Sequence, residues 1–290
     1  MTLLSGAARL AGRVGLTFEA ATVDHHLRAE ARAEVELVAR FAASLGIEHH
    51  VLDVAIENQT GVEAAARHAR YASLESLRVS RKLTQVATAH TASDQAETLL
   101  MRLARGTSLA GAASIQEARA DHVIRPLLFA TRTEVEAYAA ARKLEVATDA
   151  MNADPAFLRV RIREQVLPSL ERAAGPGVER ALARFSTFAA EDEAFLSEEA
   201  VRALARVRWA EDETLEAEAL GALPGPIARR VLAAWLQQHE VPLDGALVED
   251  ALRAVRELGT ATLPKDRVLA CSNGRVKILL APARLHATSS

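Results

Sequence analysis

Hydrophobic and polar positions follow two different periods along the first half of the chain. Short apolar or alternating runs, the pattern of β-strands, occupy residues 16–23, 48–54, 85–89 and 123–128. Apolar stripes at helical spacing occupy residues 31–45, 61–81, 92–103 and 131–143. Strands that alternate with helices of this length indicate βαβ units. The pattern therefore predicts an α/β fold with a parallel sheet.

Local signals mark where several of these elements begin and end. Gly46 directly follows the stripe of 31–45, which is typical of a helix C-cap. Thr131 and Glu134 have the spacing of a capping box and open the helix that runs to about Lys143. The first residues differ, because an apolar helical pattern starts at Met1 without a cap or a loose tail. We expect the chain to start inside an element.

The pattern changes after residue 148. A polar loop at 148–156 leads into an arginine-containing helix that Pro168 is expected to interrupt. The strongest break is Gly175-Pro176-Gly177, so we predict one domain over 1–172 and a second over 173–290. The helices expected in the second domain are 178–207, 227–239 and 247–258, and its short strands lie at 263, 268–271 and 276–280. This order predicts a helical linker and a small α+β domain.

Composition narrows the class of protein. The 290 residues are 50% hydrophobic and 25% charged, which is typical of a globular chain and excludes global disorder. Cys271 is the one cysteine, so an internal disulfide and a cysteine-based zinc or iron–sulfur site are excluded. We expect a reducing, cytoplasmic location, and no membrane contact, because no apolar run reaches roughly 18–20 residues. The net charge of −3 confines nucleic-acid binding to local patches.

Two polar stretches follow predicted strands, where open α/β sheets bind their ligands. The first contains Asp24, His25 and Arg28, and a polar loop with a capping aspartate explains it without any ligand. In the second, His90 and Asp94 are one helical turn apart and can face one site. Such a pair could move protons or hold a phosphate-bound Mg²⁺. A capping box beside a hydrogen-bonded histidine explains this second stretch equally well.

Arginines at every second position mark a third stretch, namely Arg159, Arg161 and Arg163. Guanidinium groups grip phosphates through two hydrogen bonds. Residues 155–184 contain six basic and three acidic side chains, an excess of three, which favours a tRNA or nucleotide patch in an acidic protein. A solvated helix face is the alternative. Weaker candidates are Arg67, Arg70, Arg105 and Gly106.

Read in order, these stretches resemble the tRNA(Ile)-lysidine synthetases of the N-type ATP pyrophosphatase, or PP-loop, superfamily. The matching segments are 22–28, 63–71, 89–98, 102–106, 124–128 and 149–168. Each segment is weak alone, but their fixed order over about 20–170 is specific. The resemblance implies an adenine-nucleotide alpha hydrolase-like, Rossmann-like sheet domain.

The resemblance also implies a ligation in two steps. The C2 oxygen of the wobble cytidine in tRNA(Ile) with anticodon CAU attacks the α-phosphate of ATP, and pyrophosphate leaves. The side-chain amine of free L-lysine then attacks C2 and displaces AMP, which gives lysidine. ATP and Mg²⁺ are the implied cofactors, tRNA(Ile) and lysine are the implied partners, and a homodimer is left open.

Individual roles follow from the same resemblance. The implied catalytic residues are His90, Asp94, Arg159 and Arg163, with Asp94 also at the metal. The implied ATP contacts are Asp24, His25, Arg28, Arg105 and Gly106. The implied tRNA or lysine contacts are Arg67, Arg70, Arg125, Asn152 and Arg161.

The sequence departs from the family pattern in several places. His26, Ala31, Ser93 and Val160 stand where the family usually has glycine, serine, an acidic residue and asparagine. The family loop Ser-Gly-Gly-x-Asp-Ser is not in the sequence, and Met1–Leu4 resembles the run that follows that loop. We therefore expect a start placed just past the loop and the first strand. Losing two backbone donors would cost on the order of 10⁴ in rate. An upstream stop codon with no such coding stretch before Met1 would contradict a misplaced start.

Two other functions stay open beside the ligase. One is a truncated relative that binds tRNA without catalysis. The other is a sister PP-loop enzyme that modifies tRNA differently, such as a thiolase. Sulfur chemistry generally uses paired cysteines, and Cys271 stands alone, which disfavours the thiolase.

Overall fold

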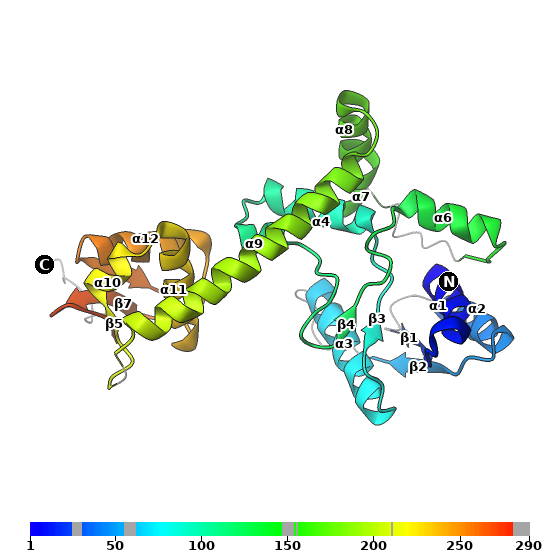
Figure 1. The fold of residues 1–290 in the computed structure, drawn as a ribbon, viewed down its shortest axis with the longest axis horizontal. Coiled ribbons are helices and arrows are strands. Elements are labelled where there is room, and N and C mark those ends of the chain that lie inside the picture. Colours follow the sequence, from blue (N-terminus) through cyan, green and yellow to red (C-terminus); the bar gives the residue numbers. More distant parts are fainter. Residues whose placement is uncertain (25–30, 55–61, 147–153, 155, 210, 281–290) are drawn as a thin grey trace, which may run out of the picture. The chain divides into compact units, whose positions relative to one another are not determined.

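The structure is a computed structural model that describes residues 1–24, 31–54, 62–146, 154, 156–209 and 211–280. It divides into two compact units, Met1–Phe188 and Ala189–Ser290. Figure 1 shows the elements of both units in chain order. None of the helices in these described ranges is long and apolar enough to cross a membrane.

Parallel strand pairs form the sheet structure of the first unit. β1 (Ala20–Asp24) pairs in parallel with β2 (His49–Asp53), and α2 (Ala31–Ser44) connects and packs on them. β3 (Val86–Ala87) pairs in parallel with β4 (Val123–Ile124). The predicted α/β class and parallel pairing are confirmed. The strands are shorter than the apolar runs predicted, because a strand extends only where a partner lies opposite.

Helices alternate with these strands along the chain, and most match the predicted stripes. Their bounds are α1 (Thr2–Val14), α3 (Val62–Ser80), α4 (Ala92–Ala104), α5 (Leu109–Ala112), α6 (Arg132–Ala141), α7 (Leu158–Arg161) and α8 (Leu167–Ala174). The long α9 (Val178–Val207) begins after the break that Gly175-Pro176-Gly177 predicted. Gly175 and Gly177 both adopt positive φ angles, which glycine tolerates and other residues rarely do.

Pro168 does not interrupt the helix that carries the arginines, contrary to the prediction. α7 continues into a π-helical turn, η2 (Ile162–Val166), and then into α8, where Pro168 lies in the first turn. Proline has no N–H, and its ring clashes with the carbonyl four residues earlier in a regular α-helix. The wider turn, in which the Leu167 N–H donates to the carbonyl of Ile162, removes that conflict. The segment therefore stays helical.

A small apolar cluster joins the helices that carry the candidate site. Ala96 of α4 is fully buried against Ile162 and Leu167. Partly buried side chains complete the cluster: Leu100, Met101, Leu158 and Leu182. Because Ala96 has so small a side chain, α4 and η2 approach closely. This contact sets the position of the neighbouring Arg159 relative to α4.

The second unit has its own core and an antiparallel sheet. Its four strands are ordered β5-β8-β7-β6, with bounds β5 (Leu215–Glu216), β6 (Thr260–Leu263), β7 (Arg267–Ser272) and β8 (Arg275–Leu280). Its shorter helices are α10 (Ala217–Ala222), α11 (Gly225–Gln238) and α12 (Gly245–Arg256). Trp235 of α11 lies in the core and is 1% exposed. The α+β composition agrees with the pattern, whereas β5 and α10 were not predicted.

Candidate functional site

The N-terminus of α4 carries a helix cap, and the capping carboxylate of Asp94 has a second oxygen. The Thr91 hydroxyl accepts a hydrogen bond from the Asp94 N–H at 3.3 Å. In return, Asp94 Oδ2 accepts from the Thr91 N–H at 2.8 Å and from its hydroxyl at 2.7 Å. Asp94 Oδ1 is left for other contacts. Asp94 can therefore cap the helix and also take part in a site, because Oδ2 serves the cap and Oδ1 serves the site.

Two carboxylates of α4 face two arginines from other helices. Asp94 and Glu97 are one turn apart, and Arg159 of α7 binds both: Nη2 lies 2.8 Å from Asp94 Oδ1, and Nε lies 2.5 Å from Glu97 Oε2. Arg132, the first residue of α6, places Nη2 at 3.8 Å from Asp94 Oδ1 and 4.0 Å from Glu97 Oε1. We call Asp94, Glu97, Arg132 and Arg159 the carboxylate cluster. Its formal charges balance.

Parts of this cluster are buried without a hydrogen-bond partner. Glu97 is 0% exposed, and its Oε1 accepts no hydrogen bond. The Nε of Arg132 is likewise buried and donates none. A buried polar atom left unpaired costs about 1–3 kcal/mol, and such atoms are rare outside functional sites. The cluster is therefore built at a cost in stability that ligand binding could offset.

Glu97 was missed as a site residue by the sequence prediction. It belongs to the stretch 89–98 that resembles the family, from which the sequence prediction takes only His90 and Asp94. The available signal was a carboxylate on the buried side of a helix, next to Ala96 and three residues after Asp94. Acidic side chains are almost never fully buried unless they are paired.

His90 lies between β3 and α4, close to several of the predicted arginines. Burial lowers the pKa of His90 to about 4. The charge of Asp94 acts in the opposite direction, while the nearby Arg125, Arg159 and Arg67 lower the pKa further. Its Nδ1 is 3.0 Å from the Thr88 hydroxyl. At neutral pH the ring is therefore neutral, a hydrogen-bonding group and not a cation.

Arg125 and Arg67 approach the His90 side of the site from different elements. Arg125 follows β4, is 2% exposed and donates to the carbonyl of Gln116, while its Nε is buried without a partner. Arg67 of α3 places its guanidinium over the Tyr71 ring, 5.2 Å from the centroid, and Arg119 does the same at 5.2 Å. The side chains of Arg67, Tyr71 and Arg119, but not that of Arg125, line a cavity of about 480 Å³ beside α3.

Other predicted residues lie elsewhere or make local contacts. Arg105 and Gly106 end α4, whose 13 residues separate its two ends by about 20 Å. Arg161 donates to the carbonyl of Ala156 at 2.8 Å, and Arg163 pairs with the adjacent glutamate at 3.6 Å.

For other assigned residues we give only the element that carries them. Asp24 ends β1, and Arg70 is exposed on α3. His25, Arg28 and Asn152 lie outside the described residues. The ATP, tRNA and lysine roles of all these residues stay predictions.

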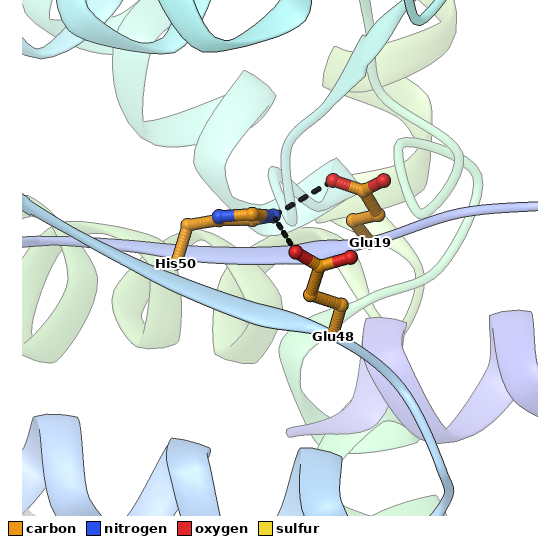
Figure 2. A group of neighbouring side chains, drawn as sticks. All are labelled: Glu19, Glu48 and His50. Atoms are coloured by element: carbon orange, nitrogen blue, oxygen red, sulfur yellow. Dashed lines mark hydrogen bonds and ion pairs between the residues drawn. The ribbon is translucent and has the colours of Figure 1, made fainter. Parts of the chain in front are cut away.

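A second charged group lies at the opposite, N-terminal ends of β1 and β2. His50 Nε2 is 2.7 Å from Glu19 Oε2 and 3.7 Å from Glu48 Oε1, and Figure 2 shows the three side chains converging. Their ligand atoms lie within 4.8 Å of one another, which a metal ion could accept. Arg81 already pairs with both glutamates, and its hydrogen bond lowers the pKa of Glu19. The arginine supplies the positive charge, so this group is an ion-pair network that ties the end of α3 to the sheet.

Comparisons with known proteins agree with one another about the family. Residues 1–170 match the family model described as a PP-loop domain. The tRNA(Ile)-lysidine synthase of Salinispora tropica is 38% identical and covers 82% of this chain and 73% of its own. That of Thermobifida fusca is 36% identical, covering 90% of this chain and 80% of its own. That of Streptomyces coelicolor is 36% identical, covering 96% and 81%.

A solved structure shares the fold at low sequence identity. The U34-tRNA thiolase NcsA from Methanococcus maripaludis, solved with its 4Fe-4S cluster, superposes with a TM-score of 0.53. The match covers 66% of this chain and 69% of that chain at 17% identity. At that identity the likeness concerns the fold alone, and it supports the predicted adenine-nucleotide alpha hydrolase-like class.

Proposed function

The chain belongs to the tRNA(Ile)-lysidine synthase family of PP-loop domain proteins, and from this premise we propose that it forms lysidine on tRNA(Ile) at the expense of ATP. The observation that carries the proposal at the level of chemistry is the carboxylate cluster beside His90. There, charged groups of both signs meet at the end of a parallel strand, where α/β folds place their ligands.

The first step needs positive charge around the phosphates of ATP. When the cytidine C2 oxygen attacks the α-phosphate and pyrophosphate leaves, negative charge develops on the departing oxygens. We propose that Arg159, Arg125 and Arg67, which all influence His90, supply that charge. The neutral His90 ring can then hydrogen-bond to the nucleotide without adding or removing charge. Arg163 and Arg161 would contact tRNA at the edge of the same site.

The metal proposal concerns Asp94. Mg²⁺ bound with ATP would neutralise charge on the phosphate oxygens. The donor set fits in one respect only: Asp94 Oδ2 is held by Thr91, so Oδ1 is the atom left for a metal, in competition with Arg159. We therefore propose Asp94 as a single protein ligand and assign no others.

The second step needs a negative partner for lysine and an acceptor for a proton. We propose that Asp94 and Glu97 attract the ammonium group, because Glu97 Oε1 lacks a hydrogen-bond donor. A carboxylate of the cluster takes one proton from the bound ammonium group. The resulting amine attacks C2, the bond between C2 and its adenylated oxygen breaks, and AMP leaves with that oxygen.

The test is lysine incorporation into tRNA. Purified protein in excess over tRNA is given ATP and radiolabelled lysine, so that a single turnover is measured. The substrate is tRNA(Ile) with anticodon CAU, and the matched control carries uridine in place of the wobble cytidine. We expect ATP-dependent label in the first tRNA and none in the second. Binding of the first tRNA without label would instead support the non-catalytic tRNA-binding alternative.

A further inference from the structure

Arg132 is part of the carboxylate cluster, but the proposed reaction gives it no task. Its guanidinium approaches Asp94 and Glu97 to 3.8 and 4.0 Å, within ion-pair range but too far for a hydrogen bond. The atoms that lack partners are its own Nε and the Oε1 of Glu97, the oxygen that it approaches. Arg132 therefore forms a long ion pair with a carboxylate to which it makes no hydrogen bond.

The backbone of Arg132 is fixed from three helices. Its N–H donates to Ser93 Oγ at 2.8 Å, and that hydroxyl donates to Glu179 Oε2 of α9 at 2.5 Å. Ser93 is 1% exposed, so these bonds are shielded from water. The capping box of Thr131 and Glu134 adds a further constraint at the start of α6. The backbone of Arg132 is thus held in place, whereas its side chain is 40% exposed.

Arg159 is held differently. It comes from the four-residue α7, which leads into the π turn η2, and π turns often accompany functional sites. Its side chain is 42% exposed and currently makes the hydrogen bonds to both carboxylates. If Arg159 turned toward an anionic substrate group, Glu97 would be left fully buried with no hydrogen-bonded cation. Removing one partner of a buried ion pair is strongly destabilising.

We propose that Arg132 is a positioning residue. When Arg159 turns to bind the substrate, Arg132 replaces it as the hydrogen-bond donor to Asp94 and Glu97. This inference rests on the proposed function for the identity of the substrate, but not for the exchange of partners. A shift of about 1 Å would bring the Arg132 guanidinium into hydrogen-bond range of both carboxylates. Both carboxylates are then held in place while Arg159 contacts the substrate.

The exchange predicts strong coupling between the two arginines in the absence of any ligand. We expect Arg132→Gln and Arg159→Gln each to lower the melting temperature by about 2–4 °C, because the other arginine compensates. We expect the double variant to lower the melting temperature by at least twice the sum of the two single decreases. Adding Glu97→Gln to the double variant restores more than half of that loss, since the uncompensated charge is gone. Arg180→Gln, which breaks the exposed pair with Glu134, is the matched control. Its decrease in melting temperature should simply add to that of Arg159→Gln.

Two results would overturn the inference. The first is additivity of Arg132→Gln and Arg159→Gln. The second is a triple variant that melts as low as the double variant, or that fails to fold as the double variant does. Either result would mean that Arg132 does not compensate the charge of Glu97.

Kinetics give a readout that a merely structural role would not move. In the lysine-incorporation assay, Arg132→Gln lowers kcat by about 10-fold or more without weakening tRNA binding, and Arg132→Lys recovers most of it. Equal rates for Arg132→Gln and the unaltered protein would contradict the positioning role. If the unaltered protein incorporates no lysine at all, the proposed function fails, and the melting experiment still decides the role of Arg132.

Discussion

Burial sets the charge of single residues at this site, and His90 is the clearest case. Because burial and three nearby arginines lower the pKa of His90 to about 4, the folded protein binds a proton there less readily than the unfolded chain, whose histidine has its ordinary value of about 6.5. The unfolded chain therefore binds more protons between these two values. Linkage then requires stability to fall as the pH drops from about 6.5 to 4.

This loss of stability on acidification gives a direct prediction for His90→Gln. Acidification should destabilise the variant less than the unaltered protein, by on the order of 1–2 kcal/mol, since the His90 ring is only partly shielded from solvent. Thermal melts between pH 4 and 7.5 measure the difference. Curves for the two proteins that run parallel over this range would show that His90 does not carry the effect.

Sequence alone identified part of the residue-scale picture. The spacing of His90 and Asp94 predicted that they share a site, and the resemblance added Arg159. Glu97 had a sequence signal, namely a carboxylate on the buried side of a helix, but Arg132 had none, because its contacts depend on how α6 packs against α4. Periodicity shows which side of a helix is buried, but it does not show which charged group from another helix lies opposite.

At the level of elements, the cap of α4 is part of the site. Thr91→Ala removes the hydroxyl that binds Asp94 Oδ2, and we expect a loss of about 1 kcal/mol in stability. Because Asp94 also loses its orientation, lysine incorporation should fall as well. Asp244→Ala at the N-cap of α12, where the carboxylate accepts from the Leu247 N–H at 2.8 Å, is the matched control.

The two cap variants differ in what they predict for activity. Both should lose similar stability in urea unfolding, but only Thr91→Ala should lose lysine incorporation. A Thr91→Ala variant with full activity would mean that the cap serves α4 alone and that Arg159 suffices to orient Asp94.

The order of elements was readable from periodicity, while local exceptions were not. Residues 92–103 and 131–143 had both apolar stripes and capping signals, so local chemistry and packing agreed. The π turn η2 at 162–166 had no such signal, because it reconciles Pro168 with packing on Ala96. The two-residue β5 is likewise defined by its partner β8 and not by its own sequence.

At the scale of the whole molecule, the two units can be observed separately. The chain has two tryptophans, Trp209 and Trp235, and both belong to the second unit. Trp235 is 1% exposed, and its Nε1 donates to the carbonyl of Glu213 at 2.7 Å. Tryptophan fluorescence therefore reports unfolding of the second unit, whereas circular dichroism reports helices of both.

We expect these two signals to respond differently to changes in the first unit. The double variant of Arg132 and Arg159 should lower the melting transition seen by circular dichroism and leave the fluorescence transition unchanged. Coincident shifts in both signals would show that the units unfold as one cooperative structure.

The family was recognisable from the ordered motifs of about 150 residues, although each motif was weak. A fixed order reflects the path of the chain through the strand ends, so it carries information about the fold that no single motif has. Net charge and composition, in contrast, only excluded classes of protein.

The most direct test of the central claim measures lysine incorporation by Glu97→Gln under single-turnover conditions. Glu97 is fully buried in the carboxylate cluster. A loss of lysine incorporation in this variant would therefore locate the reaction at the cluster. We predict a rate at least about 100-fold below that of the unaltered protein, with binding of tRNA(Ile) retained. Glu249→Gln, which breaks an exposed pair with Arg229, serves as the control and should keep the full rate. A Glu97→Gln variant that joins lysine to tRNA(Ile) at the unaltered rate would contradict the claim.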